Sequence, residues 1–205
     1  MSENSIYLTG ALAVAAAIGV AGYLYKQGNV SALDGIDGPG PNLVIEVAGQ
    51  ANGEVVIDLL DDVAPRHVAQ VTELARTGAY DGVAFHRVID GFMAQTGDVE
   101  FGGIGGDLRR AGTGSSSLPD IPAEFSDIPF KRGVVGMARR FKKDSANSQF
   151  FIMYGTASHL DGQYTVIGHV ISGMEVIDAL KKGDPDLNGA VREDPDRMVK
   201  VTVVP

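Results

Sequence analysis

Short runs rich in β-branched and aromatic residues recur along the chain from residue 42 onward, and glycine-containing segments separate most of them. The 205 residues include 27 glycines, which favours tight turns and short strands over long helices. Strands and helices do not alternate as a parallel α/β sheet requires. Eight runs predict strands: 43–47, 55–60, 84–89, 93–96, 134–138, 149–153, 165–170 and 199–204.

Two segments predict helices. Residues 64–77 carry apolar side chains at three- and four-residue spacing, with Pro65 in the first turn and Gly78 after the end. Residues 174–181 form the second helix, which ends before Gly183. Closure removes the exposed edges of an antiparallel sheet, so these elements predict a mainly β fold. We expect a closed eight-stranded antiparallel β-barrel capped by two α-helices.

The N-terminal segment has a different composition, because no charged residue occurs between Glu3 and Lys26. Residues 6–25 would span about 30 Å as a helix, which matches the hydrocarbon core of a bilayer. We therefore expect residues 1–26 to form a transmembrane anchor or a signal segment. A cleaved signal and a buried helix are the alternatives, and no basic residue precedes the apolar run as a signal requires.

Residues 27–41 (QGNVSALDGIDGPGP) are rich in glycine and proline and show no periodicity, which predicts a flexible linker. A folded domain of residues 42–205 remains. We expect a single-pass protein, attached to the membrane through residues 6–25, whose domain is periplasmic or extracytoplasmic. Lys26 is the only nearby basic residue, so a soluble periplasmic protein and a cytoplasmic-facing domain stay open.

Several classes of function are disfavoured by composition and motif. The absence of cysteine excludes thiolate catalysis, and a net charge of −9 argues against nucleic-acid binding. Residues 101–106 (FGGIGG) lack the flanking strand and helix of a phosphate-binding loop. The four histidines include no pair at metal-site helical spacing, and His67 is expected on an exposed helix face. We expect no metal and no cofactor.

The segment 85–95 (FHRVIDGFMAQ) places a charged Arg87 within an apolar strand. A buried guanidinium is costly unless a ligand or a partner satisfies it. Arg87 therefore either serves a ligand, faces solvent, or pairs with a structural carboxylate such as Glu124. The aromatic and methionine residues near it are core residues by default.

Four motifs occur in a fixed order: FHRVIDGFMAQTGD, GVVGMARR, DSANSQFFI and LDGQYTVIGHVISGMEVID. Together they resemble the cyclophilin-type peptidyl-prolyl cis–trans isomerases, and most closely the bacterial members. The resemblance extends over residues 43–182. It implies an eight-stranded antiparallel barrel closed by two helices, an isomerase that assists protein folding, and clients that contain proline. It also implies that no cofactor is needed, and we expect a monomer.

The reaction can be argued physically. Rotation about an X–Pro bond has a barrier of about 18–20 kcal/mol, because twisting removes the resonance of the amide. The twisted prolyl nitrogen gains a lone pair, so a donor aimed at that nitrogen stabilises the transition state more than the planar ground state. Arg87 matches the family's catalytic arginine, and the resemblance assigns it this role.

The resemblance also implies a set of substrate-binding residues. Four side chains would line the pocket for the proline ring: Phe92, Met93, Phe151 and Leu160. Gln95 would bond the substrate backbone and help to hold Arg87, and His86 would form a polar wall. The remaining residues would lie along the bound peptide: Ala138, Arg139, Gln149 and Tyr164.

Three departures from the family pattern affect these expectations. Arg139 and Arg140 stand where many eukaryotic relatives carry Asn-Ala, so side-chain preferences around the peptide would differ. His159 replaces a tryptophan associated with binding of cyclosporin, which predicts weak binding of that drug. Tyr164 replaces a histidine at the edge of the pocket, and a phenol can supply a similar wall and hydrogen bond.

A function of another class also fits the sequence. The groove could recognise proline-containing segments as a binding module or holdase chaperone, with turnover only incidental. A proline-isomerisation assay separates the two, since only the enzyme would lose activity when Arg87 is replaced.

Overall fold

The computed structural model describes residues 37–205. The predicted anchor or signal, residues 1–26, and residues 27–36 of the predicted linker lie outside the described residues. Within the described range, no helix has the length and apolar character needed to cross a bilayer.

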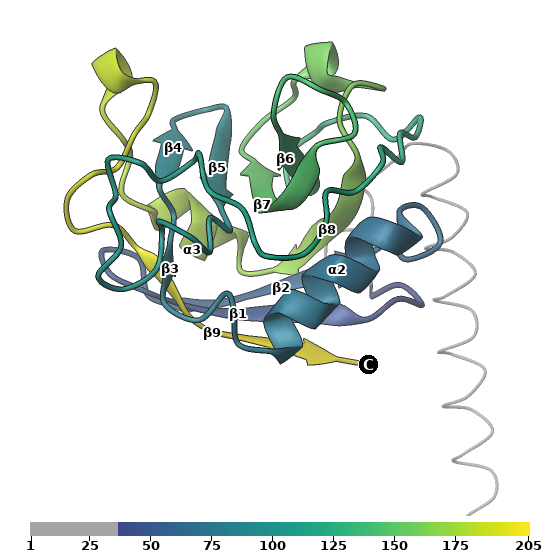
Figure 1. Cartoon of the computed structure of the whole chain (residues 1–205), viewed down its shortest axis with the longest axis horizontal. Helices are drawn as coiled ribbons and strands as arrows, with labels where there is room; N and C mark the ends of the chain where they lie inside the picture. Colours follow the sequence, from purple (N-terminus) through teal and green to yellow (C-terminus); the bar gives the residue numbers. More distant parts are fainter. Residues whose placement is uncertain (1–36) are drawn as a thin grey trace, which may run out of the picture.

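Nine strands form one antiparallel sheet with the spatial order β3-β9-β1-β2-β8-β6-β7-β5-β4 (Figure 1). The strands are β1 (Asn42–Ala48), β2 (Gly53–Leu59), β3 (Val83–Ala84), β4 (Arg87–Ile89), β5 (Met93–Thr96), β6 (Val134–Arg139), β7 (Ala146–Met153), β8 (Val166–Ser172) and β9 (Arg197–Val204). The predicted mainly β, antiparallel fold with two helices is confirmed.

The strand count and the closure of the barrel differ from the prediction. The run expected as one strand, 84–89, forms β3 and β4, because the two residues between them bond elsewhere. Phe85 N donates to Asp196 O and Val191 N donates to His86 O, both at 2.9 Å. β3 and β4 are the two ends of the sheet order, yet they are neighbours in the chain. The sheet therefore curls into a barrel whose ends are joined by the chain itself rather than by a strand ladder.

Two α-helices and two 3-10 turns accompany the sheet: α2 (Pro65–Arg76), α3 (Met174–Ala179), η2 (Ser158–Leu160) and η3 (Pro185–Leu187). Helix α2 packs against β9 and β7, and α3 packs against β2. The predicted apolar face of α2 is buried, as expected from its spacing. Figure 1 shows η2 and η3 projecting on the same side of the molecule as the ends of β4 and β5.

The environment of His67 differs from the expected exposed helix face. His67 is fully buried, since it precedes Val71 and Leu74 by four and seven residues and therefore shares their face. Its Nδ1 lies 2.6 Å from Oε2 of Glu124. A polar residue on the core face of α2 is thus accommodated by a carboxylate from a distant loop.

Residues 37–41, the end of the predicted linker, lie against β2. Gly38 N donates to Oδ2 of Asp58 at 3.2 Å, and Leu59 N donates to Pro41 O at 3.0 Å. A Cβ at Gly40 would lie 1.9 Å from Leu59 O, so only glycine permits this approach.

Buried apolar side chains form two clusters. The larger one fills the barrel and packs against α2 and α3. The smaller one includes Met93, Phe130, Phe151 and Leu160, and Phe92, Ala138 and Tyr164 pack against it from the surface. The smaller cluster supports the groove described below.

Candidate active site

A cavity of about 530 Å³, which we call the apolar cavity, opens on the surface between β4, β5, β6, β7 and η2. Nine of the eleven residues predicted for the site line it. The complete lining is Arg87, Phe92, Met93, Gln95, Ala138, Arg139, Phe151, His159, Leu160, Gln163 and Tyr164.

Phe151 forms one wall of the apolar cavity, and three neighbours fix its ring. It stacks on Phe130 with ring centroids 5.7 Å apart and meets the edge of Tyr164 at 5.8 Å. A Cβ at Gly136 would come within 2.6 Å of both phenylalanine rings. Glycine in β6 therefore allows Phe151 to lie flat beside the strand.

Phe92 and His159 form an opposing wall of the apolar cavity. Their rings stack with centroids 5.9 Å apart and an interplanar angle of 28°. Met93 and Leu160 are buried at the cavity and belong to the smaller core cluster. The cavity thus presents rigid apolar walls of a size suited to a small ring. The weak cyclosporin binding expected from His159 stays a prediction.

Arg87 lies half-buried at the edge of the apolar cavity, on β4. Its Nε and Nη2 donate to the O and Oδ1 of Asn188, both at 3.0 Å, and Nη1 donates to Oε1 of Gln95 at 3.2 Å. Burial lowers the pKa of Arg87. No carboxylate of the described residues pairs with Arg87, and Glu124 bonds His67 instead, so the suggested ion pair with Glu124 is wrong.

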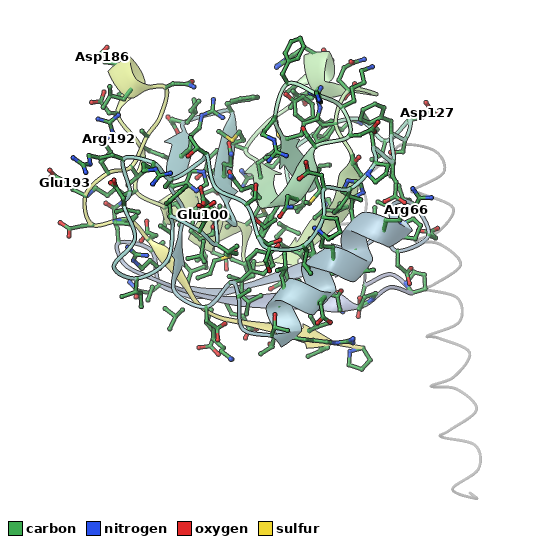
Figure 2. The ribbon with its side chains drawn as sticks, in the orientation of Figure 1. Arg66, Glu100, Asp127, Asp186, Arg192 and Glu193 are labelled. Atoms are coloured by element: carbon green, nitrogen blue, oxygen red, sulfur yellow. The ribbon has the colours of Figure 1, made fainter. Side chains whose placement is uncertain are left out.

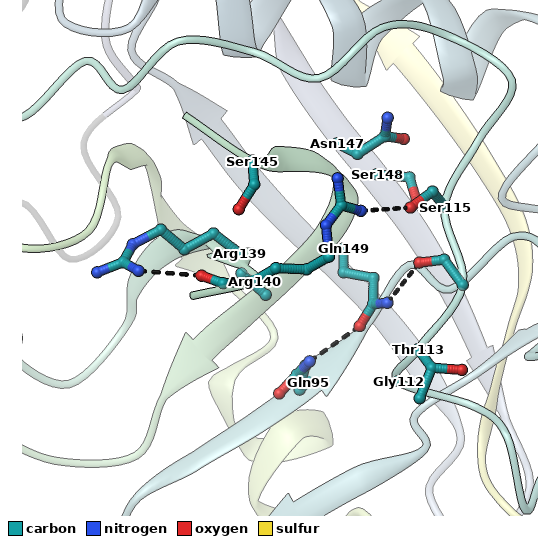
Figure 3. Close-up of a pocket in the computed structure, with 12 residues that line it drawn as sticks. Gln95, Gly112, Thr113, Ser115, Arg139, Arg140, Ser145, Asn147, Ser148 and Gln149 are labelled. Carbon is teal, nitrogen blue, oxygen red and sulfur yellow. Dashed lines mark hydrogen bonds between the residues drawn. The ribbon is translucent and has the colours of Figure 1, made fainter. Parts of the chain in front are cut away.

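A directed chain of amides leads away from Arg87. Gln95 Nε2 donates to Gln149 Oε1 at 2.9 Å, and Gln149 Nε2 donates to Gly114 O at 2.8 Å (Figure 3). An arginine side chain has no acceptor, so Gln95 must turn its oxygen toward Arg87 and its NH₂ group toward Gln149. Because Arg87 can only donate hydrogen bonds, it determines the orientation of the side-chain amides of Gln95 and Gln149.

Gln149 lies in a second cavity of about 300 Å³, which we call the polar cavity because most of the residues that line it are of polar types (Figure 3). It shares Gln95, Ala138 and Arg139 with the apolar cavity. The other residues that line it are Gly112, Thr113, Gly114, Ser115, Arg140, Ser145, Asn147, Ser148 and Gln149. The two cavities are therefore adjacent and meet at the three shared residues, and we call them together the groove.

The side chain of Arg139 is held where the two cavities meet. Its Nε and Nη2 donate to Gln163 O at 3.3 and 3.1 Å, and the guanidinium lies 4.5 Å from the centre of the Tyr164 ring. Arg140 points to the other side, where its Nη1 donates to Ser115 Oγ at 3.0 Å (Figure 3). Arg139 therefore walls the apolar cavity and Arg140 borders the polar one.

Buried Asp98 holds the glycine-rich loop of the polar cavity. Its Oδ2 accepts from Gly112 N at 2.7 Å and from Gly114 N at 2.8 Å, and its Oδ1 accepts from Phe101 N at 2.9 Å. A Cβ at Gly114 would lie 2.2 Å from Oδ1 of Asp98. The glycine-rich sequence around residues 101–114 thus serves to wrap backbone N–H groups around one internal carboxylate.

The structure places His86 behind the groove, so it lines neither cavity. It is buried, with only 4% of its surface exposed. Burial lowers the pKa of His86 to about 4. Its ring faces Gly112, where an added Cβ would be 3.4 Å away.

Some residues of the groove were not expected from the sequence. Gln163 lines the apolar cavity, and Asn188 holds Arg87 from a segment 101 residues further along the chain. Asn188 and Gly189 form an Asn-Gly pair, which signals a turn but does not reveal what that turn contacts.

Comparison with known proteins supports the interpretation of the groove. The family model described as Cyclophilin type peptidyl-prolyl cis-trans isomerase/CLD matches residues 43–203. A probable peptidyl-prolyl cis-trans isomerase from Brucella suis is 58% identical over 154 residues, which cover 74% of this chain and 78% of that protein. A peptidyl-prolyl cis-trans isomerase from Helicobacter pylori is 38% identical over 136 residues, which cover 64% of this chain and 77% of that protein.

Two solved structures are similar in fold. Cyclophilin AquaCyp293 from Hirschia baltica gives a TM-score of 0.63 at 26% identity, covering 78% of this chain and 73% of that one. The second is a Cryptosporidium parvum cyclophilin type peptidyl-prolyl cis-trans isomerase, crystallised in the presence of the dipeptide Ala-Pro. It gives a TM-score of 0.66 at 24% identity, and the match covers 80% of this chain and 99% of that one.

Proposed function

The chain belongs to the cyclophilin-type peptidyl-prolyl cis–trans isomerases, and we propose that its apolar cavity binds the proline ring of a client polypeptide while Arg87 stabilises the twisted X–Pro bond. One observation carries this assignment. A guanidinium whose partners are all neutral lies at the edge of a rigid apolar cavity of suitable size. Its positive charge is therefore available to a substrate.

The reaction needs only a change in geometry, since no covalent bond forms or breaks. As the amide twists, the carbonyl loses its conjugation and the prolyl nitrogen becomes a hydrogen-bond acceptor. An N–H of Arg87 directed at this nitrogen binds the twisted state more strongly than the planar one, and that difference lowers the barrier. The apolar walls at Phe151, Phe92 and Leu160 hold the ring while the preceding residue rotates.

The peptide on either side of the proline would lie along the two adjacent cavities. Ala138 and Arg139 end β6 where the cavities meet, and their backbone can pair there with an extended segment. Gln95 can bond the client backbone with the capacity that Arg87 and Gln149 leave free. These contacts demand little of client side chains, which fits an enzyme that assists the folding of many proteins.

The test is a proline-isomerisation assay on the full chain and on Arg87→Ala. We expect kcat/KM to fall by roughly 100-fold, the scale of losing one transition-state donor. Arg109→Ala is the matched control, because Arg109 is exposed and its side chain pairs with Asp107 rather than with any residue of the cavities. Unchanged activity in Arg87→Ala would refute the role of Arg87. Peptide binding without turnover in the unmodified protein would instead favour the binding module or holdase.

We propose in addition that residues 6–25 attach the domain to a membrane, with the domain on the periplasmic or extracytoplasmic side. The uncharged twenty-residue sequence supports this proposal. Protease accessibility in intact cells and in spheroplasts tests sidedness, and N-terminal sequencing tests cleavage. Protection of the domain in spheroplasts would contradict the proposed side. Sedimentation of the purified protein tests the expected monomer.

A further inference from the structure

We propose that Asn188 is a positioning residue that fixes the guanidinium of Arg87 for the isomerisation reaction, and this inference rests on the proposed function. Asn188 accepts two hydrogen bonds from Arg87, one at its backbone O and one at its side-chain Oδ1, both at 3.0 Å. A single residue thus occupies the whole Nε–Nη2 edge of the guanidinium. Two parallel bonds fix both the position and the plane of this group.

The backbone of Asn188 explains how one residue supplies both acceptors. Asn188 ends η3 in the left-handed conformation, with φ 55° and ψ 38°, and Gly189 follows with φ 77°. Asparagine and glycine tolerate this conformation better than other residues. The carbonyl and the side chain of Asn188 can therefore face the same guanidinium.

The loop that carries Asn188, residues 183–190, is fastened to the strand that carries Arg87. Val88 N donates to Gly189 O at 2.8 Å, and Gly183 N donates to Val88 O at 2.9 Å. A Cβ at Gly189 would lie 2.4 Å from Cγ1 of Ile89, so the loop packs against β4 with no space for a larger residue. These contacts hold Asn188 at a fixed position relative to β4.

The tip of this loop is exposed and makes no contact with the apolar cavity. Figure 1 shows it rising beside β4, and Figure 2 labels Asp186 at its tip. The loop therefore affects the groove only by holding the guanidinium of Arg87. This separation makes its effect on Arg87 measurable without changing the walls that would bind the proline ring.

A count of N–H groups identifies the donor that stays available. A guanidinium side chain has five N–H groups. Asn188 takes one from Nε and one from Nη2, Gln95 takes one from Nη1, and the sulfur of Met93 lies 3.8 Å from Nη1. One N–H of Nη2 then has no acceptor in the described part of the chain. We assign this N–H as the donor to the prolyl nitrogen.

The first experiment compares kcat and KM of the full chain, Asn188→Gly and Asp186→Ala. Asn188→Gly keeps the left-handed backbone and its carbonyl but removes Oδ1, so the loop should fold as before. We expect kcat to fall roughly tenfold while KM stays within about twofold, since the walls of the apolar cavity are untouched. Asp186→Ala changes the same loop without touching Arg87, and should behave as the unmodified protein. Equal kcat values for all three would overturn the proposal.

A second measurement reads Arg87 directly. In side-chain nitrogen NMR of the unmodified protein, the Nη2–H of Arg87 that bonds Oδ1 of Asn188 should exchange with solvent more slowly than the Nη–H groups of exposed Arg192, and Asn188→Gly should abolish the difference. The Nε–H of Arg87 should keep its protection in this variant, because its acceptor is the backbone O of residue 188. Equal exchange in the unmodified protein would overturn the positioning role even if a variant failed to fold. If Arg87→Ala were fully active, the proposed function would fail first. Normal kcat in Asn188→Gly beside an impaired Arg87→Ala would refute only the inference about Asn188.

Discussion

Two charged sites, the groove at Arg87 and the start of α2 at Glu124, satisfy their charges in opposite ways. Arg87 is held by a carbonyl and two amide oxygens, all of them neutral. Glu124 accepts from the ring of His67 at 2.6 Å and from the backbone N–H groups of Arg66 and His67 at 3.1–3.2 Å. The first arrangement leaves a net charge facing a cavity, whereas the second uses the charge internally.

The pKa values at the Glu124 site reflect this internal use of charge. Burial acts to raise the pKa of Glu124, but the hydrogen bonds from His67 and the backbone outweigh it and the pKa is lowered. Burial lowers the pKa of His67, so the ring is neutral and donates from Nδ1. Because Glu124 also satisfies free N–H groups of the first turn of α2, its charge stabilises the fold. A charged group oriented only by neutral partners is, in contrast, the one that can act on a ligand.

The largest expected effect is that of Arg87→Lys, which keeps the charge of the groove but removes the planar fork. Lysine cannot bond Asn188 and Gln95 while it also directs an N–H into the apolar cavity. We expect kcat/KM to fall by roughly 100-fold, equivalent to about 3 kcal/mol, with little change in Tm. The proline-isomerisation assay and a thermal melt measure the two. Activity within a few-fold of normal would show that charge alone is sufficient.

A smaller effect, on stability alone, is expected from Glu124→Ala. The change leaves the buried Nδ1–H of His67 and two backbone N–H groups without their acceptor, which should cost about 2 kcal/mol of unfolding free energy. Urea unfolding measures this loss, and the activity of the folded protein should be unchanged. Glu193→Ala is the control, since Glu193 is exposed (Figure 2). A loss of kcat with normal stability would contradict the division between the two sites.

The smallest effect is a pH dependence of stability that His67 contributes. Its folded pKa lies below the unfolded value of about 6.5, so the unfolded chain binds more protons as the pH falls below 6.5, and stability decreases. The comparison is made between pH 6.5 and 5.5, where the unfolded histidine takes up its proton. His67→Asn keeps an N–H donor for Glu124 but does not titrate, so its stability should fall less over this range.

His86 acts in the same direction in both proteins, because burial lowers its pKa to about 4. The difference between the two pH profiles therefore isolates His67. Identical slopes from urea unfolding at each pH would show that the pKa of His67 is the same in the folded and unfolded chains, and would contradict the prediction.

Local signals predicted much of the fold. The β1–β2 hairpin and α2 follow from alternation, three- and four-residue spacing, Pro65 and Gly78, all of which act within one element. The division of the run 84–89 into β3 and β4 had no such signal, because its cause is a bond from Phe85 N to a residue more than one hundred positions later. Local patterns cannot reveal a strand interrupted by a distant segment.

The candidate site also has a part that the sequence predicted and a part that depends on distant segments. The walls of the apolar cavity were expected because whole motifs resemble a known family, whereas the partners that orient charge were not. Asn188 is 101 residues from Arg87, and Glu124 is 57 from His67. The spacing of His67 with Val71 and Leu74 did indicate a buried face, but the polar side chain suggested exposure instead. For His67, the polar residue type therefore led to a wrong prediction of exposure, whereas the helical spacing indicated the burial that is observed.

The position of β9 has a consequence for the order of folding. This strand follows every other strand of the described sheet in the chain, yet it lies between β3 and β1. Until β9 docks, β1 and β3 each present an unpaired edge, and the pairings that cover them join residues far apart in sequence, which are slow to form. The segment that bonds Phe85 and His86 directly precedes β9. Arg87 follows these residues immediately, so we expect its strand to reach its final geometry only after β9 has docked.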